Sequence, residues 1–520
     1  MDKRILIFDT TLRDGSQTEG MTFSVGDKKE IISRLDALGV DFIEGGMPQS
    51  NPTDHNLFDS VRMPEHAALV AFGSTCRPGI PASEDMGMRT LSECGAEWIS
   101  IFGKSWRFHV DNVLRITPKE NLRIIYDSIR FLTDKGKRVI FDAEHYFDGY
   151  KDDPEYASEV IKTAEKAGAE WITLCDTNGG SLPSEVGRIV SATADIVSCG
   201  IGIHCHNDSD LAVACTLSAV ENGAGMVQGT INGLGERCGN ANLCSVIPDL
   251  TLKMGYEVNA DVTMLTSVSR AVAEIANMTH DSSMPYVGSK AFTHKGGMHI
   301  DALLKNPHTY EHITPESVGN HRNYLISEQT GKAGVVKKLT ELGIDADDRH
   351  VRSVLERIKD LESKGYQFEG ADASLELLIR RECGGLTSPF MIPAFRIYID
   401  EIDNGSIKSE ASIKVADEFG NLEHTASDGD GPVDALNNAL KKALTKFFPD
   451  VGEIRLTDYK VRVLDEKAAT AAPVRVMIRT TDGVEQWSTV GVSTNVIEAS
   501  LIALVDSMEY MLLKKTWRGT

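Results

Sequence analysis

The sequence predicts an α/β fold: a (β/α)8 TIM barrel, then small helical linker subdomains, then a C-terminal α+β domain with a pseudo-repeat. Two observations support this prediction. Eight short apolar runs alternate with amphipathic stretches over the first ~250 residues. After residue 390, a pattern of strands followed by a helix occurs twice with the same spacing. A chain of 520 residues is too long for one core, so two or three domains are expected.

The barrel is predicted over residues 1–277. Its eight expected strands are 5–8, 42–45, 68–73, 98–102, 139–143, 171–175, 200–204 and 226–231. The alternative is an open doubly wound sheet, which usually has fewer strands and often a glycine-rich first turn that this chain lacks.

Polar residues cluster where these strands end. Strand-to-loop transitions are polar in general, but that explains one or two such residues better than a whole series. In a barrel the carboxyl ends of the strands share one face, and that face carries the active site. The series is Arg13, Asp14, Glu44, Thr75, Glu144, Asp176, Thr177, Asn178, His204, His206, Asn232 and Asn240.

Four of these residues form a candidate metal site: Asp14, His204, His206 and Asn240. Two histidines two apart on a strand point to the same face, and the first, seventh and eighth strands are neighbours in a closed barrel. One carboxylate, two imidazoles and one amide oxygen suit Mg²⁺, Mn²⁺ or Zn²⁺.

Three more residues are candidates for catalysis or substrate binding. Arg13 would polarise a carbonyl oxygen or hold a carboxylate, unless it forms a structural ion pair with an acid such as Glu44. Glu144 is a general-base candidate, and its alternative is a solvated loop residue. Thr177 would donate to a bound carboxylate or cap the next helix.

Residues 278–388 are predicted to form the linker subdomains. Helical patterns cover 260–277, 347–364 and 373–383, and a loop rich in glycine and histidine spans 291–301. His299, in that loop, is by default a surface histidine.

Residues 389–520 hold the repeat, in which Gly420 and Gly483 are 63 positions apart, as are Val433 and Val496. Each half reads as strands followed by a helix. Gly429, Gly431 and Gly491 precede the helices, where free backbone N–H groups would bind a carboxylate. The alternative is a domain that only dimerises.

The composition excludes several classes of protein. A net charge of −22 argues against general binding to nucleic acid or anionic membranes. No apolar run approaches ~20 residues and the first residues lack a secretory signal, so we expect a cytoplasmic protein. The nine cysteines are scattered without a CxxC pair and are expected to be reduced.

Four motifs resemble one enzyme family: residues 9–15 (DTTLRDG), 204–208 (HCHND), 232–242 (NGLGERCGNAN) and 291–302 (AFTHKGGMHIDA). The chain is similar throughout to the isopropylmalate, homocitrate and citramalate synthases. The resemblance implies a Claisen-type condensation of acetyl-CoA with a 2-oxo acid at a divalent metal. It also implies a homodimer and a C-terminal regulatory domain that binds an allosteric amino acid.

The resemblance assigns roles residue by residue. The metal ligands fall on Asp14, His204, His206 and Asn240, and the arginine that polarises the carbonyl falls on Arg13. The strand-5 glutamate falls on Glu144. The linker histidine, which reaches an active site of the partner subunit, falls on His299, and a linker tyrosine falls on Tyr310.

Within the family, residues 303–312 and 327–332 look most like the citramalate synthases, which use pyruvate and serve isoleucine biosynthesis. Feedback inhibition by isoleucine is then expected. Isopropylmalate synthase, with 2-oxoisovalerate in leucine biosynthesis, and homocitrate synthase are the alternatives.

Two readings from other classes are disfavoured. A carbon–carbon lyase similar to hydroxymethylglutaryl-CoA lyase would lack the long C-terminal domain. An amino-acid sensor on a decayed barrel would not need the intact set of Arg13, Asp14, His204, His206 and Asn240.

Overall fold

The computed structural model describes residues 4–327, 330–384, 386–401, 407–464 and 471–518. The chain divides into two compact units. The first comprises Met1–Phe292 and His312–Arg322, and the second comprises Thr293–Glu311 and Asn323–Thr520. The predicted division at residues 277 and 388 stays a prediction. Two residues of the segment 327–332, Glu328 and Gln329, lie outside the described residues.

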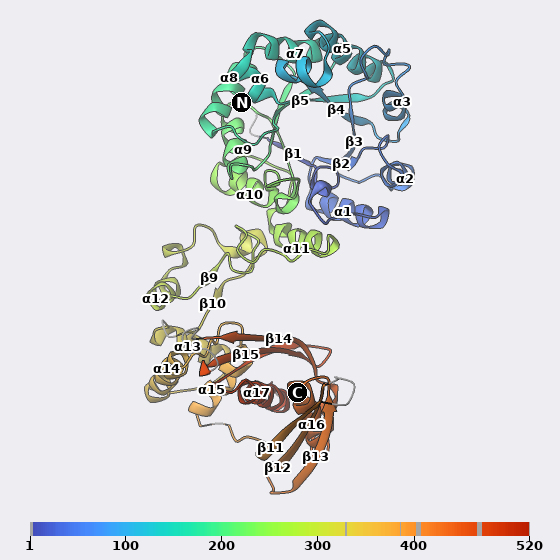
Figure 1. Cartoon of the computed structure of the whole chain (residues 1–520). Helices are drawn as coiled ribbons and strands as arrows, with labels where there is room; N and C mark the ends of the chain where they lie inside the picture. Colours follow the sequence, from blue (N-terminus) through green and yellow to red (C-terminus); the bar gives the residue numbers. More distant parts are fainter. Residues whose placement is uncertain (1–3, 328–329, 385, 402–406, 465–470, 519–520) are drawn as a thin grey trace. The chain divides into compact units, whose positions relative to one another are not determined.

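The first unit contains the predicted closed barrel of eight parallel strands. The strands pair in sequence order. The barrel closes where β8 pairs with β1, with Leu6 opposite Met226. Figure 1 shows the helices as an outer ring around these strands. The strands are β1 (Leu6–Asp9), β2 (Phe42–Gly46), β3 (Ala68–Ser74), β4 (Trp98–Lys104), β5 (Arg138–Glu144), β6 (Trp171–Asp176), β7 (Gly200–Cys205) and β8 (Met226–Gly229).

Local sequence signals set where the barrel helices begin. Four of them, α2, α5, α7 and α8, carry proline in the first turn. Proline has no N–H group, and it is tolerated there because N–H groups of the first turn have no acceptor within the helix. Ser24 and Asp27 form a capping box at the start of α1. The helices are α1 (Val25–Leu38), α2 (Pro52–Ser60), α3 (Met86–Glu93), α4 (Arg107–His109), α5 (Pro118–Asp134), α6 (Tyr146–Asp152), α7 (Pro154–Ala167), α8 (Pro183–Ala194), α9 (Ala212–Glu221), α10 (Leu243–Pro248) and α11 (Leu265–Ile275).

The two ends of the barrel differ in chemistry. Near the amino ends of the strands, a cluster of large apolar side chains that includes Phe8, Phe42 and Trp98 fills the interior. At the carboxyl ends, polar side chains such as Asp14, Asp142 and His204 are buried instead. Burial of polar groups is costly unless they are paired, so this end is the candidate site.

The second unit contains linker elements and a C-terminal α+β domain. Three linker helices, α13, α14 and α15, share one apolar core with residues of the C-terminal domain such as Val490. The linker elements are β9 (Thr293–His294), α12 (Gly297–Lys305), β10 (Asn323–Tyr324), α13 (Lys332–Glu341), α14 (Asp348–Ser363) and α15 (Asp372–Glu382).

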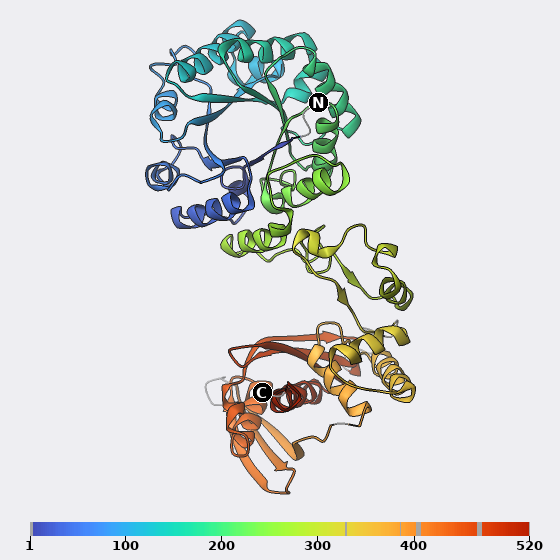
Figure 2. The ribbon, with the colours of Figure 1, turned by 180° about the vertical axis from the view of Figure 1, so that it is seen from behind.

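The predicted repeat is confirmed as two units of three antiparallel strands and a helix. The first is β11 (Phe390–Glu401), β12 (Ile407–Asp417), β13 (Leu422–Gly429) and α16 (Pro432–Leu444). The second is β14 (Arg455–Val463), β15 (Val474–Thr481), β16 (Gln486–Ser493) and α17 (Val496–Arg518). Each helix packs on its own sheet and the two helices touch each other, as Figure 2 shows from behind.

The glycines before these helices have a packing role that the sequence did not reveal. A Cβ on Gly491 would lie 2.1 Å from Ala499 O, and one on Gly429 would lie 2.2 Å from Ala435 N. Only glycine permits this close approach of strand and helix. Gly429 and Gly491 thus allow each strand to pack closely on its helix, and the expected carboxylate site stays a prediction.

All nine cysteines are free thiols. In the described part of the chain, none of the helices combines the length and the apolar character needed to span a membrane.

Candidate active site and metal centre

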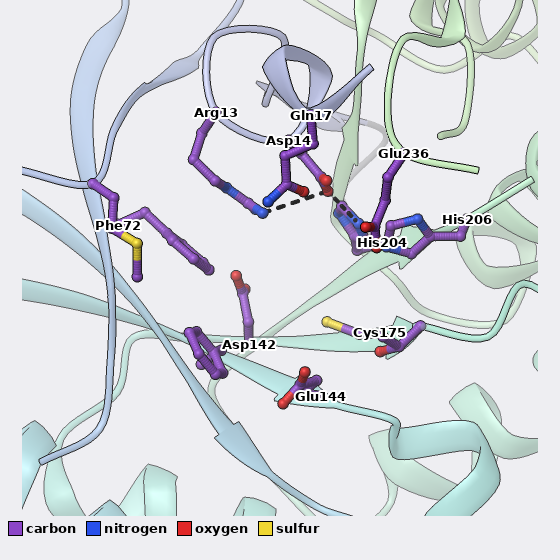
Figure 3. A pocket seen from close by; sticks show the side chains of 13 residues that line it. Arg13, Asp14, Gln17, Phe72, Asp142, Glu144, Cys175, His204, His206 and Glu236 are labelled. Carbon is purple, nitrogen blue, oxygen red and sulfur yellow. Dashed lines mark ion pairs between the residues drawn. The ribbon is translucent and has the colours of Figure 1, made fainter. Parts of the chain in front are cut away.

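A cavity of about 320 Å³ opens among the carboxyl ends of the barrel strands. Figure 3 shows its side chains, which come from almost every strand end. Six of the residues expected at the site line it: Arg13, Asp14, Glu144, Thr177, His204 and His206. The others are Gln17, Met47, Phe72, Phe102, Asp142, Cys175 and Glu236.

Asp14, His204 and His206 converge at one side of this cavity. One potential ligand atom from each lies within 4.8 Å of the other two. Asp14 Oδ2 and His204 Nε2 are 3.1 Å apart, and all three residues are buried. A carboxylate and two imidazoles held this closely are a suitable donor set for a divalent transition metal or magnesium.

Asn240 joins this group through the backbone, because it forms an isolated β-bridge with His206. Its Nδ2 donates to Leu234 O at 3.0 Å. Its Oδ1 is buried without a hydrogen-bond partner among the described residues, and so is His206 Nδ1. Two buried polar atoms without partners need an explanation, and a cation held by this donor set would supply one.

Electrostatics favour an ionised Asp14. Burial opposes ionisation, but Arg13 and the hydrogen bond from His204 outweigh it and hold the pKa of Asp14 well below its usual range. Burial and the neighbouring His204 lower the pKa of His206 to about 3. His206 is therefore neutral at physiological pH, as a metal ligand must be.

A buried hydrogen-bond chain orients His204. Gln228 on β8 donates from Nε2 to Asp142 at 3.1 Å and to Thr173 at 3.0 Å. Its Oε1 therefore faces His204 Nδ1, 3.0 Å away. Because an amide oxygen only accepts, Nδ1 donates a proton to it, and this bond directs Nε2 toward Asp14.

These hydrogen-bonded side chains were not predicted from the sequence, although the sequence contains a signal for them. Each strand concerned carries one polar residue inside an apolar run, which is unusual for a buried strand. Ser100 closes the chain by donating to Asp142 Oδ2 at 2.9 Å. The residues are Ser100, Asp142, Thr173 and Gln228.

Arg13 is fixed on three sides. Its Nε donates to Glu44 Oε2 at 2.6 Å, and its Nη1 lies 3.6 Å from Asp14 Oδ2. Its guanidinium carbon lies 3.8 Å from the centre of the Phe72 ring. The ion pair with Glu44 thus exists, yet Arg13 still lines the cavity and can meet a ligand there.

Glu144 ends β5 on the opposite side of the cavity from Arg13 (Figure 3). It forms an ion pair with Lys104, a residue that the sequence analysis did not consider. The next residue, His145, has a left-handed backbone with φ of 58°, which is uncommon for a residue other than glycine. Thr177 Oγ1 accepts from His145 N at 2.9 Å and so holds this turn. The Thr177 hydroxyl proton remains available to a ligand.

His299 and Tyr310 belong to the second unit. Their rings stack with centroids 4.1 Å apart, and Tyr310 is about half exposed. The structure thus brings these two residues together and assigns them to a different unit from the barrel residues.

Other polar strand ends have local roles. Asp176 accepts from Ser181, Asn178 donates to Asp148, and Asn232 donates to Ser269 O.

The cavity therefore combines a donor set suited to a metal ion, a fixed guanidinium group and, across from that group, the Glu144 carboxylate. Such an arrangement can bind a small chelating anion and remove a proton from a second substrate.

The chain matches three family models in succession. The HMGL-like model covers residues 4–272, the homocitrate synthase post-HMGL domain-like model covers 286–366, and the LeuA allosteric (dimerisation) domain covers 369–512.

Curated relatives match over the whole length. The chain is 49% identical to an (R)-citramalate synthase of Aquifex aeolicus (strain VF5), covering 100% of both chains. It is 46% identical to an (R)-citramalate synthase of Synechocystis sp., covering 97% of this chain and 96% of the relative. It is 32% identical to a probable 2-isopropylmalate synthase of Methanopyrus kandleri, covering 97% and 98%.

Proposed function

This chain belongs to the (R)-citramalate synthase family, and we propose that it condenses acetyl-CoA with pyruvate to give (R)-citramalate and CoA. It is an acyltransferase of the type that converts the acyl group into an alkyl group on transfer. The observation that carries the proposal is one cavity lined by Asp14, His204 and His206, with Arg13 beside them and Glu144 opposite.

Asp14, His204, His206 and Asn240 would hold a divalent metal ion, Mg²⁺, Mn²⁺ or Zn²⁺. Such an ion polarises the keto group of a 2-oxo acid and offsets the negative charge that develops on its oxygen. Gln228 keeps His204 oriented for this task through its Nδ1.

The protein groups account for the remaining chemistry. Arg13 binds the 2-oxo acid and stabilises the developing alkoxide from a position fixed by Glu44 and Phe72. Thr177 donates its free hydroxyl proton to the carboxylate. Glu144 removes a proton from the methyl group of acetyl-CoA, with His299 as the alternative base.

Bonds and charges balance in this scheme. The electron pair of the broken C–H bond forms the enolate, whose carbon bonds to the keto carbon. The keto oxygen takes up a proton, and water then cleaves the thioester to release CoA.

Aromatic side chains in the cavity wall support pyruvate as the acceptor. The rings of Phe72 and Phe102 stack with centroids 5.5 Å apart and line it. The side chain of 2-oxoisovalerate has two more methyl groups than that of pyruvate, and these aromatic walls would restrict it.

A homodimer belongs to the proposal, because two edge strands of the second unit expose apolar side chains. On β11, Phe395 and Ile399 are exposed, and on β14 Tyr459, Val461 and Val463 are exposed. Among the described residues, each strand pairs on one side only. A second copy would cover these faces, and the exposed pair of His299 and Tyr310 would then complete the partner's site.

The C-terminal domain, residues 389–520, would bind isoleucine as a feedback inhibitor of a cytoplasmic enzyme of isoleucine biosynthesis. The match to an allosteric domain supports a regulatory role. The test adds isoleucine or leucine and follows activity and melting temperature. A response to leucine alone would contradict this assignment and favour 2-isopropylmalate synthesis.

The substrate is tested by CoA release from acetyl-CoA with Mg²⁺ or Mn²⁺ and three acceptors: pyruvate, 2-oxoisovalerate and 2-oxoglutarate. We expect pyruvate to be preferred by roughly tenfold or more. A preference for either of the other acids would reject citramalate synthesis while leaving the metal site and the condensation in place.

A further inference from the structure

Lys104 lies directly against the proposed base. Its Nζ forms an ion pair with Glu144 Oε2. The Lys104 and Glu144 side chains are only 17% and 23% exposed, so water screens their interaction less than it would at the surface. None of the steps described above uses Lys104.

The fold fixes this lysine in place. Lys104 and Glu144 end neighbouring strands and are register partners in the pairing of β4 with β5. Asn121 donates to Lys104 O at 2.8 Å. The ammonium group also lies 5.5 Å from the centre of the Phe102 ring, which lines the cavity. The position is therefore set by the barrel itself and not by a loop.

The other cations near the cavity are already committed. Arg13 is held by Glu44 and Asp14, and Arg237 is held by Asp208 and Glu236. Lys104 is thus the one cation paired with Glu144 among the ion pairs of the described residues.

The proposed reaction makes two oxyanions. Arg13 lies beside Asp14 and His204, where the keto oxygen would be held. The second oxyanion is the thioester oxygen of acetyl-CoA when its methyl group loses a proton to Glu144. With Glu144 as the base, this oxyanion would form near Glu144, which lies across the cavity from Arg13 (Figure 3).

We propose that Lys104 donates to the thioester oxygen of acetyl-CoA and stabilises the enolate that Glu144 generates. This inference rests on the proposed function. An ammonium group has three N–H donors, and Glu144 engages one side of it. Before proton transfer, the charge of Lys104 is matched by the Glu144 carboxylate. After transfer, Glu144 is neutral and the same cation is matched by the enolate.

The charge thus moves from one oxygen to another while the cation stays still. Little reorganisation is needed when a preorganised donor already faces the developing charge. The methyl proton goes to Glu144, the C–H electron pair goes into the enolate, and Lys104 keeps all its protons. The alternative is that Lys104 only holds the Glu144 side chain in place.

The first experiment replaces Lys104 with methionine, glutamine or arginine in the full chain. Lys137→Met is the matched control, because Lys137 precedes β5 at its other end and donates to Cys94 O and Ala96 O at 2.8 and 2.7 Å. Wild type must first release CoA with pyruvate. If it does not, the proposed function fails before Lys104 is tested.

We expect Lys104→Met and Lys104→Gln to lower kcat roughly 10²–10³-fold, the usual loss for one oxyanion donor. The KM for pyruvate should change little, and the isotope effect with trideuterated acetyl-CoA should rise as proton removal becomes limiting. Lys104→Arg should restore part of the rate because it keeps the charge. Lys137→Met should match wild type in the isotope effect, whatever its melting temperature. A kcat within roughly threefold of wild type in both neutral variants would overturn the proposal.

The second experiment separates stabilisation of the enolate from positioning of Glu144. It measures the affinity of two CoA thioethers, one with a carboxylate in place of the acetyl group and one neutral. A charge that acts on the enolate should favour the anionic mimic. We expect Lys104→Met to weaken binding of the anionic thioether by roughly tenfold or more and to leave binding of the neutral thioether almost unchanged. Equal losses would assign Lys104 a positioning role and refute the inference.

Discussion

Replacement of Phe102 by leucine should widen the acceptor range. Phe102 is half-buried, lines the cavity and stacks on Phe72 at an interplanar angle of 19°. Phe72 is the less suitable target, because the guanidinium of Arg13 lies 3.8 Å above its ring and would move with it. Phe102 touches no candidate metal ligand in the contacts described. The Lys104 ammonium group lies 5.5 Å from the centre of its ring, but a change there would affect both acceptors alike and would not alter their ratio.

The expected magnitude follows from the acceptors themselves. The side chain of 2-oxoisovalerate exceeds that of pyruvate by two methyl groups. A leucine at position 102 frees more carbon atoms than those two groups occupy. Burial of each group is worth ~0.8 kcal/mol, so their accommodation is worth ~1.6 kcal/mol, or about 15-fold. The ratio of kcat/KM for 2-oxoisovalerate to that for pyruvate should rise by about this factor.

The assay is CoA release at saturating acetyl-CoA with each acceptor. Phe42→Leu is the control, since Phe42 belongs to the apolar cluster near the amino ends of the strands. It should lower the melting temperature and leave the ratio unchanged. If Phe102→Leu keeps its activity with pyruvate and shows no change in the ratio, Phe102 does not limit the acceptor side chain and the reasoning fails.

Three further predictions follow from other parts of the structure. Gln228→Leu removes the acceptor of His204 Nδ1 and should weaken Mn²⁺ binding roughly 10–100-fold in a calorimetric titration, while unchanged affinity would refute its orienting role. Val461→Asp places a charge on the exposed face of β14 and should halve the mass measured by light scattering, whereas an intact dimer would show that this face is not the interface. Asp36 is partly buried, but bonds from the N–H groups of Ala67, Glu65 and His66 outweigh burial and lower its pKa. The stabilisation by the ionised Asp36 is therefore present above about pH 4 and is lost as the pH falls. Asp36→Ala should lower the free energy of unfolding by ~1–3 kcal/mol at pH 7 and by progressively less below pH 4. A loss that does not depend on pH would contradict this prediction.

Much of the fold could be predicted because its signals are local. Each barrel strand is a short apolar run, and the two C-terminal repeats keep the same spacing between Gly420 and Gly483 as between Val433 and Val496. The residues expected at strand ends also meet, because parallel strands bring their carboxyl ends to one face. Arg13, Asp14, His204 and His206 are examples.

The parts that could not be predicted depend on pairing between distant segments. Gln228 contacts His204 and Asp142 only because the strands close into a barrel. Lys104 reaches Glu144 only through the register of β4 with β5. Gly491 reads as a flexible residue before a helix, and its close approach to Ala499 is visible only in the packed domain.

The charge balance of the cavity explains why both a divalent ion and Lys104 are needed for the proposed reaction. The residues that line it include four acids, Asp14, Asp142, Glu144 and Glu236, but one arginine, Arg13, which is already paired with Glu44. A 2-oxo acid adds a carboxylate, and the reaction adds negative charge on two oxygens. Repulsion between like charges is strong where water is excluded. The donor set at Asp14 suits a cation that would offset the first oxygen, and Lys104 beside Glu144 is placed to offset the second. The proposal thus assigns one positive charge to each half of the carbon–carbon condensation, a cation at Asp14, His204 and His206 for the keto oxygen and Lys104 beside Glu144 for the thioester oxygen.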